Sequence, residues 1–274
     1  MMTAYKPESI AVINRLISHL PDDWGFYVHY DMKSGVSADA LDKRAHFFSR
    51  YKVYWGAKEH MDAILLMLEE AYGSAASYDY FHMVTGEDYW TCPPGMFDSI
   101  TVPPFSYIPY YPLPRAGWFN GGYELLQYKQ LSSYGDIRKG WFAFLNRVVK
   151  WSQIVLRIRQ PLPDYPLYCG LANWSLHRTA VEEILNSPVA KDLYSRTNNT
   201  FDPEELFFQT VLMNSPLKDK LVNNSLRYID WSTVPAPKRL TADDLDTVLS
   251  SGTLFCRKVS DVKLAEMMDV RLGL

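Results

Sequence analysis

The chain has 274 residues, of which 47% are hydrophobic and 22% charged, so it is expected to fold as a soluble globular protein rather than a disordered or fibrous one. Its formal net charge of −3 provides no overall positive field to recruit nucleic acid. No uncharged apolar run reaches the roughly 18–20 residues that span a bilayer, and the first residues lack the apolar core of a signal peptide. The cysteines Cys92, Cys169 and Cys256 lie far apart, which favours a reducing, cytoplasmic location over a disulfide framework.

Helix and strand patterns alternate in the first third of the chain. The expected elements are a helix over 7–19, a strand over 25–28, a helix over 37–49, a strand over 52–55, a helix over 60–72 and a strand over 80–84. This alternation predicts an α/β fold with a mainly parallel central sheet flanked by helices. Ligands of such sheets bind beyond the carboxyl ends of the strands, where residues 29–33 and 85–89 are expected.

The middle of the chain carries a basic, aromatic segment. Between Asp136 and Asp164 there is no acidic residue, whereas six are cationic: Arg138, Lys139, Arg147, Lys150, Arg157 and Arg159. Interleaved tryptophan, phenylalanine and valine residues predict a basic amphipathic helix. Such a helix could dock on the protein with a solvated basic edge, which is the simpler interpretation. It could instead contact anionic lipid or a lipid-linked acceptor, which predicts peripheral membrane contact through 138–159.

Helices and strands return after residue 166. The expected elements are a strand over 167–174, helices over 180–186 and 203–213, a strand over 226–229, a helix over 242–250 and a strand over 254–258. We expect a single domain over 1–274. Its parts are a nucleotide-binding half (1–100), an insertion rich in proline, tyrosine and basic residues (101–165), and a half that binds acceptor and diphosphate (166–274).

Several common catalytic motifs are missing from the sequence. It has no GxxxxGK[ST] or GxGxxG loop for phosphates, and neither GxSxG nor HExxH. His29 and Asp31, two residues apart at a strand end, could bind a metal. With no third ligand in sight, hydrogen bonding within a turn is the better interpretation, so no metal site is predicted.

Charged residues in the second half of the chain could form a reactive site. Asp202 is expected to cap a helix, with Glu204 and Glu205 in its first turn, where a carboxylate could be a general base or simply stabilise the helix. Two cation pairs could neutralise a diphosphate if they converge, or else are scattered surface charges. They are Lys238 with Arg239 and Arg257 with Lys258. Trp174 is a candidate platform for a donor or acceptor sugar.

An ordered set of short motifs resembles the core-2/I-branching β-1,6-N-acetylglucosaminyltransferase family. The motifs are VHYDMKS at 28–34, VYWG at 53–56, TGEDY at 85–89, PEELFFQT at 203–210 and LFCRK at 254–258. The likeness covers most of the chain and is weakest between about residues 100 and 165. Each motif alone is weak, whereas the ordered set is fairly specific.

The resemblance implies a GT-A-like nucleotide-sugar fold and an inverting transferase that works without a metal. It places the family's catalytic glutamate at Glu205, with Glu204 where the family has aspartate. It places the diphosphate-binding cations at Lys258 and, less securely, at Arg239. Asp31 and His29 are then expected near the nucleotide. Asp88, Glu87 and Glu204 are expected near the donor sugar or the acceptor.

The chain also departs from the family pattern. Trp90 replaces the proline that follows the DY pair, and Glu87 precedes Asp88, so these two carboxylates could instead bind a metal. The many cysteines of the secreted animal members are absent, which favours a bacterial-type enzyme in the cytoplasm or at the inner face of the membrane. UDP-N-acetylglucosamine is the expected donor, while UDP-xylose and UDP-galactose-like donors stay open as alternatives. A glycan or lipid-linked glycan is the expected acceptor, in surface polysaccharide synthesis. A glycoside hydrolase with paired carboxylates and a non-catalytic glycan-binding protein stay open as alternatives.

Overall fold

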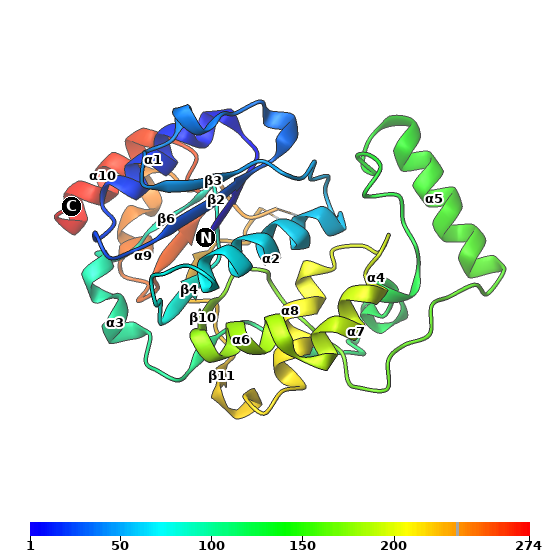
Figure 1. The fold of residues 1–274 in the computed structure, drawn as a ribbon. Helices are drawn as coiled ribbons and strands as arrows, with labels where there is room; N and C mark the ends of the chain where they lie inside the picture. Colours follow the sequence, from blue (N-terminus) through cyan, green and yellow to red (C-terminus); the bar gives the residue numbers. More distant parts are fainter. Residues whose placement is uncertain (234–235) are drawn as a thin grey trace.

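The computed structural model describes residues 1–233 and 236–274 (Figure 1). Its central sheet has four parallel strands in the order β3-β2-β1-β5. They are β1 (Met2–Ala4), β2 (Phe26–Tyr30), β3 (Ala45–Phe48) and β5 (Val84–Thr85). Every residue of β2 is buried, as expected for a strand covered on both faces. The predicted α/β fold with a mainly parallel sheet flanked by helices is therefore confirmed.

Helices cover both faces of this sheet (Figure 1). On one face α1 (Ile10–Ser18) contacts α10 (Val262–Leu272), and the apolar stripe of α1 joins a core cluster with β2. On the other face α2 (Lys58–Tyr72) contacts β1 and β2, and its apolar side belongs to a second core cluster. The 3.6-residue spacing of apolar side chains explains both placements.

Three smaller sheets and further helices complete the fold. One mixed sheet has the order β11-β7-β10-β4, a second has the order β12-β13-β6, and β8 pairs with β9. The strands are β4 (Tyr80–His82), β6 (Asp88–Trp90), β7 (Ser106–Tyr107), β8 (Tyr111–Pro112), β9 (Tyr168–Cys169), β10 (Ser175–His177), β11 (Leu221–Val222), β12 (Arg227–Ile229) and β13 (Phe255–Arg257). The other helices are α3 (Phe97–Ile100), α4 (Glu124–Gln127), α5 (Gly140–Val155), α6 (Arg178–Asn186), α7 (Pro188–Arg196), α8 (Glu204–Met213) and α9 (Leu245–Leu249).

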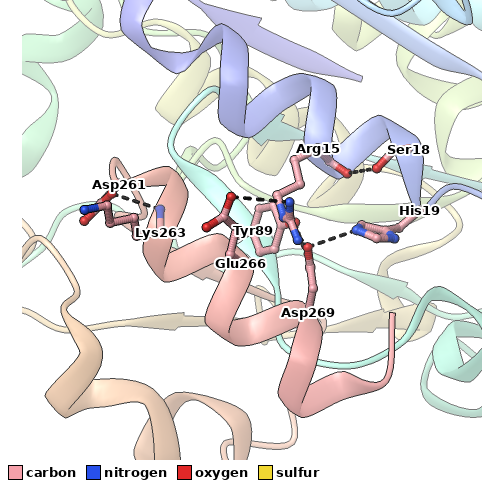
Figure 2. A network of polar contacts seen from close by, with 8 residues as sticks. All are labelled: Arg15, Ser18, His19, Tyr89, Asp261, Lys263, Glu266 and Asp269. Atoms are coloured by element: carbon pink, nitrogen blue, oxygen red, sulfur yellow. Dashed lines mark hydrogen bonds and ion pairs between the residues drawn. The ribbon is translucent and has the colours of Figure 1, made fainter.

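A buried carboxylate joins α1, α10 and β6 (Figure 2). Asp269 on α10 accepts hydrogen bonds from Tyr89 Oη at 2.8 Å and His19 Nε2 at 2.9 Å, and it pairs with Arg15 on α1. Asp269 is 1% exposed, so it needs these partners to offset its desolvation. Because Tyr89 lies in β6, the network also fixes the strand that carries Asp88.

The structure differs from the sequence prediction in four stretches. Residues 37–49 form no long helix, because 45–48 pair in parallel with β2 as strand β3. Residues 52–55 are accordingly loop, and the strand expected over 167–174 is reduced to β9. The helix expected over 242–250 is a 3-10 turn followed by the five residues of α9. In each stretch, pairing and packing with distant segments override a local pattern.

The three cysteines are buried and free, as their spacing predicts. Within residues 1–233 and 236–274, no helix combines the length and apolar character needed to cross a membrane.

Candidate active site

Charged side chains gather at the carboxyl edge of the parallel sheet. Lys6 follows β1, and Glu87 follows β5. Lys6 Nζ lies 2.7 Å from Glu87 Oε1, and Arg239 Nη1 reaches the same oxygen at 3.4 Å. A cavity of about 420 Å³ lies here. Its lining residues are Lys6, Glu8, Ser9, Glu87, Arg239 and Ser260.

Strand β13 brings two further cations to this edge. It pairs antiparallel with β6 and places Arg257 opposite Asp88. Arg257 Nη1 donates to Asn173 Oδ1 at 2.8 Å, and its Nε lies 3.6 Å from Asp88 Oδ1. Asp88 is 1% exposed, and its other oxygen accepts a hydrogen bond from the Thr85 backbone at 2.5 Å. Arg257 is thus held at a fixed place beside the sheet edge.

Lys258 follows β13 directly. With Lys6, Arg239 and Arg257 it forms a set of four cations that we call the cation group. Burial lowers the pKa of Lys258, and the positive charges of Arg257, Lys6 and Arg239 lower it further, although Glu87 opposes them. Two of the four cations, Lys6 and Arg239, pair with the single carboxylate of Glu87. The group therefore carries an excess of positive charge and can receive an anion such as a diphosphate.

Helix α8 directs two acidic residues toward the same region. Its first turn contains Glu204 and Glu205, as predicted. The predicted cap is wrong, because Pro203 holds the N-cap position and no side chain caps the helix there. Asp202 instead turns the chain with a φ of 45°, and its backbone N–H donates to Gly56 O at 3.0 Å.

Glu204 is held by a histidine from α2. Its Oε1 lies 2.7 Å from His60 Nδ1, and His60 Nε2 shares a hydrogen bond of 3.1 Å with Thr3 Oγ1 in β1. Burial lowers the pKa of His60, but the negative charges of Glu204 and Glu205 outweigh burial and raise it. This chain of contacts ties the start of α8 to the central sheet.

Glu205 has a proton affinity suited to acid–base chemistry. Burial raises the pKa of Glu205 to about 7, and the charge of Glu204 acts in the same direction, against His60 and Arg257. Burial and the same two glutamates raise the pKa of Asp202 to about 9. A carboxyl group that titrates near neutral pH can accept a proton and release it again. The charge of Arg257 acts on Glu205, so the carboxyl group lies within electrostatic range of one of the cations at the sheet edge.

Asp31 and His29 shape a loop beside this edge. Asp31 Oδ1 accepts backbone hydrogen bonds from Lys33 at 3.0 Å and Val53 at 3.2 Å, and Lys33 Nζ lies 2.5 Å from Oδ2. His29 Nε2 accepts two backbone hydrogen bonds, from residues 50 and 51. Burial lowers the pKa of His29 to about 4, although Asp31 opposes it. A neutral His29 with Nε2 engaged in this way holds the loop.

Two expectations about ligand contact need revision. Trp174 is fully buried against Phe208, with ring centroids 5.4 Å apart, so it presents no ring face to a sugar. Glu87 pairs with Lys6 and Arg239, and Asp88 lies beside Arg257, so each carboxylate already has cationic partners. In the described part of the chain, no three His, Cys, Asp or Glu side chains are grouped to hold a metal ion.

The sequence patterns did not single out several residues of the site. His60 sits in an apolar helical pattern, and its partner Glu204 is 144 residues away. Asn173 touches Arg257 across 84 residues. Lys6 had a usable signal, because it is a cation directly beyond the first strand.

A second cavity lies near the amino ends of β1 and β2. It measures about 250 Å³, and its lining includes Trp24, Tyr27, Tyr78, Tyr80 and His82. Burial lowers the pKa of His82 to about 3, so this imidazole is neutral at physiological pH. The cations of the sheet edge are absent from this lining.

One comparison with known protein families agrees with the sequence motifs. Residues 144–249 match the model of the Core-2/I-Branching enzyme family, a range that includes α8 and Arg239. Mouse xyloside xylosyltransferase 1, solved in its apo form, is a similar structure, with 11% sequence identity, coverage of 93% of this chain and 95% of that chain, and a TM-score of 0.37. No curated protein matches the chain. Over residues 144–249, less than half of its length, the chain thus matches the model of the Core-2/I-Branching enzyme family, the family that its motifs resemble.

Proposed function

We propose that the protein is an inverting glycosyltransferase that moves a sugar from a UDP-sugar to a hydroxyl group of a glycan acceptor. The observation that carries the proposal is a buried carboxyl group, Glu205, whose pKa is raised to about 7 and on which the charge of Arg257 acts. The family match to a branching enzyme supports the same reaction class. The parallel sheet supports a GT-A-like fold, with residues 1–100 as the nucleotide-binding half.

Glu205 is the proposed general base. Inversion requires the acceptor hydroxyl to approach the anomeric carbon opposite the departing UDP. As the new carbon–oxygen bond forms, Glu205 takes the hydroxyl proton and the bond to UDP breaks, leaving the electron pair on the diphosphate. Base catalysis of this kind is worth about 10²–10⁴-fold in rate. The positive charge of Arg257 keeps Glu205 from titrating still higher.

Cations are the proposed partners of the UDP diphosphate. Arg239 pairs with Glu87, whose charge also acts on Lys258, and Arg257 faces Asp88. These three cations can stabilise the charge that grows on the leaving group. With these side chains in that role, the reaction needs no metal ion. Asp31 and Asp88 then act indirectly, since Asp31 holds the loop after β2 and Asp88 faces Arg257.

The donor sugar and acceptor follow from the family. N-acetylglucosamine is the proposed sugar, joined by a β-1,6 linkage, and a surface polysaccharide or its lipid-linked precursor is the proposed acceptor. A bacterial-type enzyme of this kind works in the cytoplasm or at the inner face of the membrane. Residues 166–274 are assigned to acceptor and diphosphate binding, and residues 101–165 are an insertion with no assigned role in transfer.

UDP should stabilise the protein against heat, with or without a chelator. At 100 times its dissociation constant, a ligand adds about 2.7 kcal/mol to the free energy of unfolding. Thermal melts with UDP-N-acetylglucosamine, UDP-xylose, UDP-galactose and ADP-glucose, each with and without EDTA, measure the effect. We expect a rise in Tm of a few degrees with UDP donors, largest for UDP-N-acetylglucosamine and unchanged by EDTA.

The outcomes of these melts separate the competing explanations. A shift that EDTA abolishes would contradict diphosphate binding by cations alone and would favour a metal at Glu87 and Asp88. No shift with any UDP compound would contradict the transferase and leave a hydrolase or a glycan-binding protein.

A further inference from the structure

Two amide side chains help to hold helix α5 against the rest of the protein, beside half-buried apolar residues such as Phe142. Asn146 Oδ1 accepts a hydrogen bond from the Leu131 backbone at 2.8 Å, and its Nδ2 donates to Gln130 Oε1 at 3.1 Å. Seven residues later, on the same face, Gln153 exchanges hydrogen bonds of 2.9 and 2.8 Å with the Lys129 backbone. Asn146 is the one fully buried residue among the 16 of α5, all of which are described.

The outward face of α5 is apolar and exposed. Its side chains follow one another at intervals of three and four residues, so at 100° per residue they form a stripe about 80° wide. Their exposed fractions are Trp141 70%, Phe144 52%, Val148 46%, Trp151 58% and Val155 74%. Leu156 and Ile158 extend the apolar surface beyond the helix, with 66% and 57% exposed. Figure 1 shows α5 standing apart from the body of the fold.

This exposed stripe departs from the usual amphipathic helix of a globular protein. A helix normally buries its apolar side and turns its polar side to water. A contiguous exposed apolar patch rimmed by polar residues marks a contact surface. The two tryptophans matter most here, because their rings prefer the interface between lipid headgroups and acyl chains.

The charge around the stripe indicates what it contacts. Residues 137–163 contain no acidic side chain. Arg138 and Lys139 pair with Asp136, at 2.9 and 3.8 Å. The other four cations form no ion pair with any residue that the structure describes; they are Arg147, Lys150, Arg157 and Arg159. An apolar stripe flanked by unpaired cations complements an anionic bilayer surface.

We propose that α5 docks the protein on an anionic lipid bilayer, with the stripe from Trp141 to Val155 in the interface and the flanking cations on lipid phosphates. This surface lies outside the residues assigned to transfer. Membrane binding is therefore independent of the proposed function and needs neither donor nor acceptor. Docking would bring the enzyme to the surface on which lipid-linked glycans are found.

Vesicle flotation with the full chain tests this proposal. Vesicles of phosphatidylcholine alone are compared with vesicles that also contain phosphatidylglycerol, at about 0.1 M salt, where electrostatic attraction is still felt. The protein should float with the anionic vesicles. The double variant Trp141→Ser/Trp151→Ser should lower the partition coefficient at least about tenfold, because two large apolar groups no longer enter the interface. Arg147→Gln should lower it about fivefold, the effect of one cation near the surface.

A matched control and a second readout keep the result interpretable. Trp231, which is 45% exposed in the loop after β12, is not part of the stripe, so Trp231→Ser should bind as the parent does. Circular dichroism verifies that the double variant is folded, and its UDP-induced Tm shift should equal the parent's. Absence of anionic-vesicle binding, or equal binding by the double variant, would overturn the proposal. If the parent protein were a dimer without lipid and the double variant a monomer, the proposal would also be overturned, and the stripe would be assigned to contact with a second copy of the chain.

Discussion

Glu205→Gln should reduce sugar transfer by about 10²–10⁴-fold while leaving UDP affinity nearly unchanged. The amide keeps the size and polarity of the side chain but cannot accept the hydroxyl proton. Calorimetry with UDP and a transfer assay with UDP-N-acetylglucosamine separate the two properties. Unchanged turnover in this variant would rule out Glu205 as the base.

The pH dependence gives a second measure of the same residue. A base must be unprotonated, so kcat/KM in the parent should fall as the pH drops below about 7, the pKa to which burial raises Glu205. Glu204→Gln is the matched comparison, because Glu204 contributes to that raised pKa through its charge. This variant should keep the base and move the acidic limb to lower pH. A limb that does not move would show that another group controls it.

The raised pKa also predicts the sign of a stability effect. The pKa of Glu205 is about 7 when folded and about 4.5 when unfolded, so between these values the folded protein holds a proton that the unfolded chain releases. The free energy of unfolding contributed by this group therefore falls as the pH rises from about 4.5 to 7. Glu205→Gln should then raise stability at pH 8 by up to about 3 kcal/mol, and by little at pH 4. Denaturant unfolding at both pH values measures the difference and shows that the variant folds.

Lys258→Ala should weaken UDP binding by about 10- to 100-fold. An ammonium group that donates to a phosphate oxygen is a charge-assisted hydrogen bond, worth about 1.5–3 kcal/mol. Lys258 is partly buried, so solvent screens such a bond less. Isothermal titration with UDP gives the affinity directly.

Lys238→Ala is the matched control for that variant. Lys238 lies beside Lys258 in the fold, since its carbonyl accepts the Lys258 backbone N–H at 3.4 Å. Its side chain pairs with Asp244 at 2.6 Å and lies 4.0 Å from Asp230. Removing it deletes the same charge without touching the Glu87 group, so UDP affinity should stay within about twofold. Equal affinity in Lys258→Ala and Lys238→Ala would remove Lys258 from the diphosphate site.

The local parts of the fold and site could be predicted from sequence. Strand β2 is an apolar run with a polar end, and α2 has a broad apolar face, so each pattern carries its own assignment. The first turn of α8 was likewise predictable from Pro203, Glu204 and Glu205. These features depend on neighbours within one or two turns of chain.

What depends on distant partners could not be predicted. His60 contacts Glu204, which is 144 residues away in the sequence. That contact engages Glu204 and leaves Glu205 as the candidate base. Residues 45–48 became a strand because β2 offers a parallel edge, which no local pattern shows. The amphipathic pattern of α5 was visible in the sequence. Which side of α5 faces the protein was not visible, because Asn146 and Gln153 bond to the backbone of residues 131 and 129, and only folding brings those residues beside the helix.

The proposed transfer requires the nucleotide, the base and several cations to lie together at one edge of the parallel sheet. A crystal structure of the protein with UDP tests this most directly. We expect the diphosphate to contact Lys258 and at least one of Arg257 and Arg239 beyond the carboxyl end of β1, with the Glu205 carboxyl group facing the space next to the terminal phosphate. UDP bound instead in the aromatic cavity near Trp24 and Tyr80, or at the sheet edge with Glu205 turned away from it, would contradict the account.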